Sequence, residues 1–539
     1  MDSFVADPEC IEDRGSQVSP ARGIVPDWRP IVIVLVGLLF RVIYYVTFKP
    51  QWCGDSHQYS DDVLLWVHYS FFTGYRTPIY SLFLGVSEWL ARVPAAEVLS
   101  TSAAEIVRDV QSVLGLVTAC LFYCTLRILN VRKPVAFAAG LFFSTTSAIC
   151  SAEASIVTPS LSLLSLVLAA SLYVKIMARI GCRGQIKMLA IGAGIAFASA
   201  ALVRPDNLVF FAAILAATAA FALRSTLIPA RWDLSRRLLV GCLLLLISAT
   251  PFLIAWMTCN YLVNGRFRMT NMMGWQTTQS VYNMYGEVDP EDKVLGSIMN
   301  KYYVQTNRGR VDREYVWEGA AKEVMARASE MPYLNSAEFC GSGNQQSNWA
   351  CMFLSPEART NFNQRLGWEQ LFDYLTHVWM KLITKHPSQY LHNALDSFVG
   401  DTFDFSFMPP DPAETNDPRA VEGGNVVRSR AGWRVVYWTA LAQAPFLMVF
   451  YLITLAYVFL SPLILLNPGN NTRANDVAVT ALALGSVGTF VAFCLLESYH
   501  KQYGLPHLGV FMICAAYAAE NFNRIVGALK GTVQTVTHR

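Results

Sequence analysis

The chain has 539 residues, of which 53% are hydrophobic and only 15% are charged, whereas about a quarter of the residues in soluble domains are charged. This composition indicates an integral membrane protein. The net charge of +3 excludes the broad basic surface that nucleic-acid binding needs. No glycine-rich phosphate loop follows a strand pattern, so a soluble nucleotide-binding enzyme is not indicated either.

Residues 1–29 are polar, and they lack the short apolar region and cleavage site of a signal peptide. Apolar runs of about 20 residues then predict membrane-spanning helices. The predicted fold class is an all-α polytopic membrane protein with about ten transmembrane helices. We expect these at 30–47, 108–127, 134–152, 156–175, 188–203, 207–223, 238–258, 438–461, 476–496 and 504–522.

The connecting segments predict the orientation of the helices. With residues 1–29 placed inside, the inner segments hold 18 lysines and arginines and the short outer segments hold 5. This positive-inside bias predicts that the N-terminal segment 1–29 and the tail 523–539 are cytoplasmic. We expect a multi-pass protein, most simply of a bacterial inner membrane, with transmembrane regions 30–258 and 438–522.

Two outer segments are more than linkers. The first, 48–106, contains two short apolar stretches, 63–69 and 79–86, which suit interfacial helices with Tyr80 and Trp89 at headgroup depth. The second, 259–437, predicts a mostly α-helical extracytoplasmic subdomain with an amphipathic stretch at 368–395. Cys340 and Cys351 flank a polar stretch of it and are disulfide candidates outside the cytoplasm.

A cluster of carboxylates follows the first apolar run. Asp55 lies nearest the helix end, and Asp61 and Asp62 come one to two helical turns later. One carboxylate at a membrane surface can act as a general base for an acceptor hydroxyl; the alternative is that all three are solvated or cap the next helix. His57 beside Asp55 lacks other spaced ligands, so no metal site is predicted.

Further charged groups fall at helix ends on the same predicted face. Arg204-Pro205-Asp206 separates two apolar runs, where an arginine either snorkels or binds an anion. The stretch from Glu497 to Tyr503 is either a polar turn or a phosphate site in which His500 and Lys501 neutralise charge. Glu153 contacts a sugar or acceptor, or, as we favour, is a helix-end carboxylate in water.

Five motifs in order resemble the GT-C superfamily of polyprenyl-phosphate-sugar-dependent glycosyltransferases, in particular its protein O-mannosyltransferases and lipid A aminoarabinose transferases. They are Asp55 with Tyr59, Arg76-Thr77-Pro78-Ile79-Tyr80, Arg204-Pro205-Asp206, His386-Pro387-Ser388-Gln389-Tyr390 and Tyr503-Gly504-Leu505-Pro506. Two positions depart from the family pattern. Gln502 stands where the family has an arginine, and Glu153 is the nearest match to a glutamate expected near Thr158.

The resemblance implies that Asp55 is the catalytic base and that outer arginines hold the donor phosphate. The residues expected at the phosphate are Arg76, Arg204, His500, Lys501 and Tyr503. Those expected around the substrates are His57, Tyr59, Asp61, Tyr80, Glu153, Asp206 and Glu497.

The predicted function is that of an inverting glycosyltransferase, which moves a sugar from a polyprenyl-phosphate carrier to an extracytoplasmic protein, lipid or polysaccharide. No cofactor is expected, and the partners are the donor, the acceptor and membrane lipids, with no nucleic acid. One alternative is a transporter or flippase, although no internal repeat is visible. Another is an oligosaccharide ligase or polymerase that uses diphosphate-linked donors.

Overall fold

The structure is a computed structural model of the chain. It describes residues 27–50, 59, 76–90, 101–180, 186–228, 231–264, 267–270, 277–305, 320, 323–324, 326–327, 330–331, 362–403, 426–466, 474–496 and 501–522. Among these residues, eight helices are long and apolar enough to cross a membrane, a bent helix pair forms a ninth span, and a shorter apolar helix lies at Leu505–Glu520. Each of the ten predicted spans therefore has a helical counterpart, and the predicted fold class is confirmed.

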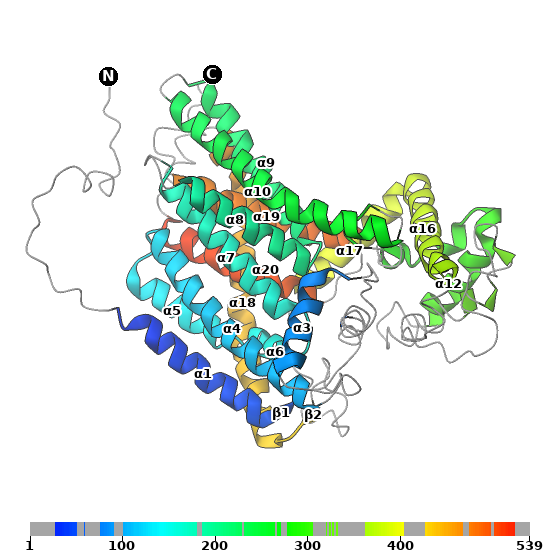
Figure 1. The fold of residues 1–539 in the computed structure, drawn as a ribbon, viewed down its shortest axis with the longest axis horizontal. Helices are drawn as coiled ribbons and strands as arrows, with labels where there is room; N and C mark the ends of the chain where they lie inside the picture. Colours follow the sequence, from blue (N-terminus) through cyan, green and yellow to red (C-terminus); the bar gives the residue numbers. More distant parts are fainter. Residues whose placement is uncertain are drawn as a thin grey trace, which may run out of the picture.

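The spanning helices pack into one bundle (Figure 1). They are α1 (Arg29–Thr47), α4 (Thr101–Ile128), the pair α5 (Lys133–Ser144) and α6 (Ser147–Ala154), α7 (Pro159–Ala178), α8 (Ile186–Val203), α9 (Asn207–Thr226), α10 (Trp232–Asn264), α18 (Arg430–Leu466), α19 (Ala474–Leu496) and α20 (Lys501–Glu520).

The helices differ in how much of their surface the protein covers. In α19, 78% of the apolar window is buried, whereas α1, α10 and α18 each have 28% buried. Small residues allow close contacts in the interior, because a Cβ added at Gly194 would lie 2.0 Å from Ser248 Oγ. The weakly covered helices therefore face the lipid, and α19 lies in the core.

The predicted span 134–152 is not a single straight helix. It breaks at Thr145 and Thr146, and α5 and α6 meet at a bend of 41°. Gln443 of α18 stabilises the break, because its amide nitrogen Nε2 donates to the Thr145 carbonyl at 2.8 Å and its Oε1 accepts from the Ser147 backbone N–H at 2.8 Å. Both partners lie about 300 residues away in sequence, which explains why the local pattern did not predict the bend.

Two further boundaries differ from the predictions. Helix α18 begins at Arg430, eight residues before the expected start of its span, and α10 continues to Asn264. A two-stranded antiparallel sheet, β1 (Phe48–Lys49) with β2 (Val426–Val427), ties the end of α1 to the segment before α18, with Phe48 opposite Val427. This pairing joins the first outer loop to the end of the large loop.

The first outer loop contributes α3 (Pro78–Leu90), which corresponds to the predicted stretch 79–86; the other stretch, 63–69, lies outside the described residues. Trp89 is 76% exposed, as an interfacial residue would be. Tyr80 was expected at headgroup depth, and this was wrong, because its side chain is fully buried. Helix α3 packs its Tyr80 face against α4 and therefore belongs to the bundle.

The described part of the large loop is helical, as predicted. It contains short 3-10 helices η4 (Thr278–Val281), η5 (Tyr285–Glu287) and η6 (Pro290–Asp292), followed by α12 (Lys293–Gln305), α16 (Phe362–Lys385) and α17 (Pro387–Phe403). Its core includes Trp379, whose ring packs against Tyr390. The Tyr390 hydroxyl bonds to the Leu495 carbonyl of α19, so α17 is anchored to the bundle. In Figure 1 this subdomain lies at the right, at the end of the bundle that carries α3, β1 and β2.

Candidate active site

Helix junctions that are far apart in sequence meet at the end of the bundle next to the β1–β2 pair. Thr77, at the start of α3, donates its hydroxyl to the Val203 carbonyl at the end of α8, with an Oγ1–O distance of 2.9 Å. Both residues are buried. Since Thr77 follows Arg76 and Val203 precedes Arg204, this bond brings two of the predicted phosphate-binding motifs to one place.

Arg76 lies on an aromatic pair. Its guanidinium carbon is 5.1 Å from the centroid of the Tyr59 ring, and the Tyr59 ring meets Tyr80 edge to face at 4.9 Å. The pair is buried, with Tyr59 5% exposed. A cation over a tyrosine face is held by the ring quadrupole. Two residues predicted near the substrates, Tyr59 and Tyr80, therefore position Arg76.

Gln111 of α4 connects this aromatic pair to the junction between α6 and α7. Its Nε2 donates to the carbonyls of Glu153 at 2.9 Å and Ser155 at 2.7 Å, and its Oε1 accepts from the hydroxyls of Tyr80 at 3.2 Å and Ser160 at 2.8 Å. Two donors and two acceptor sites complete the hydrogen-bonding capacity of an amide side chain. Gln111 is fully buried, so it fixes α3, α4 and the α6–α7 junction relative to each other.

Sequence reasoning missed Gln111 because it fell inside the predicted span 108–127. A polar residue within a spanning segment was the available signal, since such residues face the interior of a bundle and make hydrogen bonds there.

The environment of Glu153 differs from the one that the sequence predicted. We favoured a helix-end carboxylate in water, but its side chain is 1% exposed and forms an ion pair with Arg41 of α1, with an Nη2–Oε1 distance of 2.6 Å. Arg41 also donates to the carbonyls of Gly37 and Ser144, each at 3.0 Å. The ion pair therefore joins α1 to both halves of the bent span.

The space for this ion pair depends on a glycine. A Cβ added at Gly115 of α4 would lie 1.7 Å from Glu153 Oε1 and 2.7 Å from Arg41 Nη2. Arg41 was overlooked in the sequence because it lies inside the span 30–47, although an ionisable residue in a spanning helix is itself a signal.

Arg204 and Asp206 lie at the junction of α8 and α9. Arg204 Nε is 3.2 Å from Asp206 Oδ1, and the two side chains are 7% and 13% exposed. Next to them, the buried Asn207 donates its Nδ2 to Ser162 Oγ at 3.0 Å and to the Ala200 carbonyl at 2.9 Å. Arg204 is thus held inside the protein by a carboxylate, which removes simple snorkelling as an explanation for it.

A second buried polar residue reaches this junction from α20. His507 is 1% exposed, and its ring packs against Phe210 of α9 at 5.5 Å. Among the residues that the structure describes, neither ring nitrogen of His507 finds a hydrogen-bond partner. His507, which directly follows the last motif, therefore faces α9 one turn beyond Asp206.

Several predicted site residues lie outside the described residues. These are Asp55, His57, Asp61, Glu497, His500 and the disulfide candidates Cys340 and Cys351. Lys501 and Tyr503 belong to the first turn of α20, and only their backbone is described. The roles given to these residues stay predictions.

The subdomain holds a separate cluster of charges. Asp289, Glu291 and Asp292 bring carboxylate oxygens within 4.8 Å of one another. Lys381 lies among them: its Nζ bonds to Glu291 and is 3.0 Å from Asp292 Oδ2, while Lys385 bonds to Asp289. The lysines supply the positive charge that this arrangement requires, so we interpret it as an ion-pair network.

Replacing Lys381 with methionine is expected to destabilise the subdomain by about 1–3 kcal/mol, because the buried Asp292 loses a charged donor. Glu291, foremost, and Asp292 raise the pKa of Lys381 above its ordinary value of 10.5. The stabilisation is therefore complete below pH 10.5 and is lost as the pH rises through the higher pKa of the folded state. Hydrogen exchange of the peptides around Lys381 at increasing pH measures both effects.

The matched control for this variant is Lys301→Met, since Lys301 forms a more exposed pair with Glu323. That change is expected to affect stability far less, because solvent screens an exposed ion pair. Equal protection of wild type and Lys381→Met would show that the network contributes nothing to stability.

Comparison with known proteins gives distant structural neighbours. No family model matches the chain, and no curated protein matches it. The oligosaccharyltransferase of Archaeoglobus fulgidus in the apo form is 10% identical, with a TM-score of 0.42 over 94% of this chain and 52% of that chain. ArnT from Cupriavidus metallidurans bound to undecaprenyl phosphate is 15% identical, with a TM-score of 0.34 over 88% of this chain and 77% of that chain.

A further neighbour is the archaeal oligosaccharyltransferase AglB from Archaeoglobus fulgidus in complex with an inhibitory peptide and a dolichol-phosphate. It is 12% identical to the present chain, with a TM-score of 0.38 over 91% of this chain and 50% of that chain. The present chain thus spans about half the length of the archaeal protein.

Proposed function

We propose that this multi-pass membrane protein is an inverting glycosyltransferase that takes a sugar from a polyprenyl-phosphate carrier to an acceptor hydroxyl. The observation that carries the proposal is the hydrogen bond from Thr77 to the Val203 carbonyl, 2.9 Å long, which unites Arg76 and Arg204 at one end of the bundle. Two arginines beside a membrane interior form an anion site suited to a lipid phosphate.

The chemistry requires few groups. Asp55 takes the proton of the acceptor hydroxyl as its oxygen attacks the anomeric carbon. The new carbon–oxygen bond forms on the face opposite the phosphate, and the bond to the phosphate oxygen breaks with its electron pair, which inverts the configuration. Arg76 and Arg204 stabilise the charge that develops on the leaving phosphate.

The surrounding residues hold these groups in place. Tyr59 and Tyr80 support Arg76, and Asp206 orients Arg204. His500, Lys501 and Tyr503 complete the phosphate site, while His57, Asp61 and Glu497 line the substrates. Glu153 acts through the helix junction that it stabilises and has no direct contact with substrate.

The distribution of lysine and arginine supports an extracytoplasmic site. The inner segments hold 18 basic residues and the short outer segments hold 5, and this bias supports a cytoplasmic location of both termini. The subdomain would then cover the site from outside, in the manner expected of a bacterial inner-membrane enzyme.

The test is a transfer assay with the purified full chain in lipid nanodiscs. Polyprenyl-phosphate donors carrying labelled sugars are expected to release polyprenyl phosphate and to transfer the label to an acceptor of the cell envelope. This acceptor is first identified by comparing the surface glycoconjugates of cells with and without the protein. Turnover of diphosphate donors alone would instead indicate a ligase or polymerase. Sugar uptake into sealed vesicles without a covalent product would indicate a transporter.

Arg204→Met is expected to weaken donor binding by about 10–100-fold, because a charge-assisted contact to phosphate contributes about 1.5–3 kcal/mol. The matched control is Arg224→Met, which removes an exposed arginine from the opposite end of α9. Dissociation constants for an unreactive polyprenyl phosphate measure the difference. If both variants bind this lipid as wild type does, Arg204 has no part in the phosphate site.

A further inference from the structure

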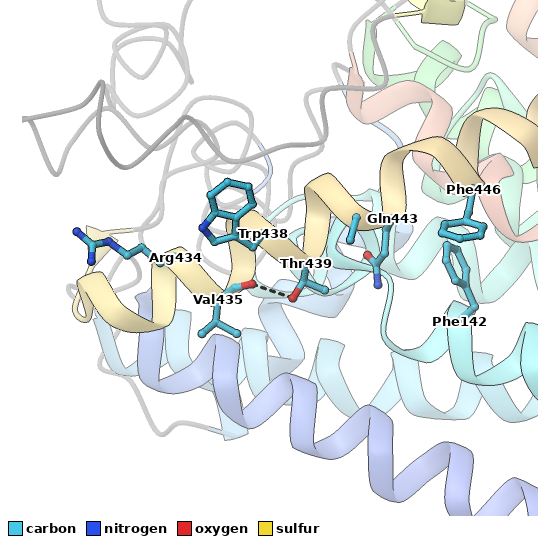
Figure 2. Close-up of a pocket in the computed structure, with 8 residues that line it drawn as sticks. Phe142, Arg434, Val435, Trp438, Thr439, Gln443 and Phe446 are labelled. Atoms are coloured by element: carbon cyan, nitrogen blue, oxygen red, sulfur yellow. Dashed lines mark hydrogen bonds between the residues drawn. The ribbon is translucent and has the colours of Figure 1, made fainter.

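A lipid-facing groove lies on the surface of the bundle beside the bent span. It has a volume of about 750 Å³ and runs between α5 and the first half of α18 (Figure 2). Its lining residues are Phe142, Arg434, Val435, Trp438, Thr439, Ala442, Gln443 and Phe446. None of them belongs to the proposed phosphate site.

The broken span shapes this groove. Gln443, which lines it, holds the Thr145–Ser147 break through two hydrogen bonds of 2.8 Å. The Thr439 hydroxyl donates to the Val435 carbonyl at 2.7 Å. The side chains of Gln443 and Thr439 are therefore occupied within the protein, and between Arg434 and Phe446 the groove offers a mainly apolar surface to a ligand.

The groove opens toward the membrane. The window of α18 is only 28% buried, and Trp438 and Phe446 are 63% and 58% exposed. In Figure 2, Phe446 and Phe142 face each other at one end of the groove, and Arg434 lies near the other. A long apolar ligand with a negative group at the Arg434 end matches this distribution.

The length of the groove limits the ligand. Arg434 and Phe446 are twelve residues apart on one helix, which corresponds to about 18 Å. This is the length of a phospholipid acyl chain and is far shorter than the polyprenyl chain of the proposed donor. Among the described residues, none forms an ion pair with Arg434, and an arginine at a membrane surface attracts anionic headgroups.

We propose that this groove binds one anionic phospholipid, with its phosphate at Arg434 and an acyl chain running along α18 as far as the contact between Phe142 and Phe446, whose rings meet edge to face at 5.9 Å. The bound lipid would cover the bent span where Gln443 holds it and brace α5 against α18. This inference concerns a site separate from that of the proposed glycosyl transfer and holds whether or not that function is correct.

The experiment uses the full chain in nanodiscs that contain phosphatidylcholine and a phosphatidylglycerol with a photoreactive acyl chain. Irradiation is expected to cross-link the labelled lipid to peptides containing Phe142 or residues 435–446. Arg434→Gln should lower this labelling about fivefold, as expected for the loss of one surface charge that attracts the headgroup. Ala442→Trp should abolish it by filling the groove, since Ala442 is exposed there.

Two variants serve as matched controls. Arg236→Gln removes an exposed arginine from α10, and Leu452→Trp enlarges an exposed residue of α18 outside the groove; both should label as wild type. Equal labelling by photoreactive phosphatidylcholine, labelling unaffected by Arg434→Gln, or displacement of the phospholipid by stoichiometric polyprenyl phosphate would each overturn the proposal. The last result would assign the groove to the donor.

Discussion

Replacing Asp55 with asparagine is expected to lower the rate of sugar transfer by about 10²–10⁴-fold, the usual contribution of a general base. Asparagine keeps the size of the side chain but cannot accept the proton of the acceptor hydroxyl. Donor binding should remain, because the phosphate contacts are assigned to Arg76 and Arg204. The measurement is the release of polyprenyl phosphate together with the dissociation constant for the donor.

Asp61→Asn and Asp62→Asn are the controls for this prediction, since the same loop carries all three carboxylates. If Asp55 alone is the base, Asp62→Asn should retain most of the activity, and Asp61→Asn, which alters a residue proposed to line the substrates, should lose far less activity than Asp55→Asn. Full activity in Asp55→Ala, with normal expression and membrane insertion, would remove Asp55 from the mechanism. A loss shared equally by all three variants would point to a structural role of the cluster.

Replacing Arg41 with methionine is expected to destabilise the bundle by about 3–5 kcal/mol, the cost of leaving one member of a buried ion pair without its partner. Glu153 is 1% exposed, so no water can replace the guanidinium. Gly37 and Ser144 would also lose the donors to their carbonyls. Unfolding of the detergent-solubilised protein by heat or denaturant measures the change.

The double variant, Arg41→Met with Glu153→Gln, distinguishes the ion pair from simple packing. It should be more stable than Arg41→Met alone, because a neutral amide is far less costly to bury than an unpaired carboxylate. If the double variant is no more stable than the single one, the destabilisation comes from lost packing of the long Arg41 side chain.

The effect of replacing Arg41 should extend to the proposed phosphate site. Glu153 stabilises the turn whose carbonyls bind Gln111, and Gln111 in turn holds Tyr80, which packs against the Tyr59 ring beneath Arg76. A buried defect at Arg41 should therefore reach the phosphate site through hydrogen bonds of 2.9 and 3.2 Å. Reduced donor affinity in Arg41→Met, measured at a temperature where the variant is folded, would demonstrate this connection.

Hydropathy alone predicted the spanning helices, because transferring an apolar segment into lipid depends on the segment's own residues. All ten predicted spans have helical counterparts. The α-helical subdomain also followed from local pattern. Helix ends were less accurate, as at Arg430 of α18, since a helix can continue past the apolar run that hydropathy detects.

The tertiary structure decided which polar residues matter inside the bundle. Glu153 was misinterpreted because its partner, Arg41, is 112 residues away, and Gln111 was overlooked because it bonds to three other segments. Hydropathy treats each residue by itself, whereas burial of a charge depends on the partner that folding supplies. The motifs of Arg76 and Arg204 were visible in the sequence, but only the Thr77–Val203 hydrogen bond brought them together.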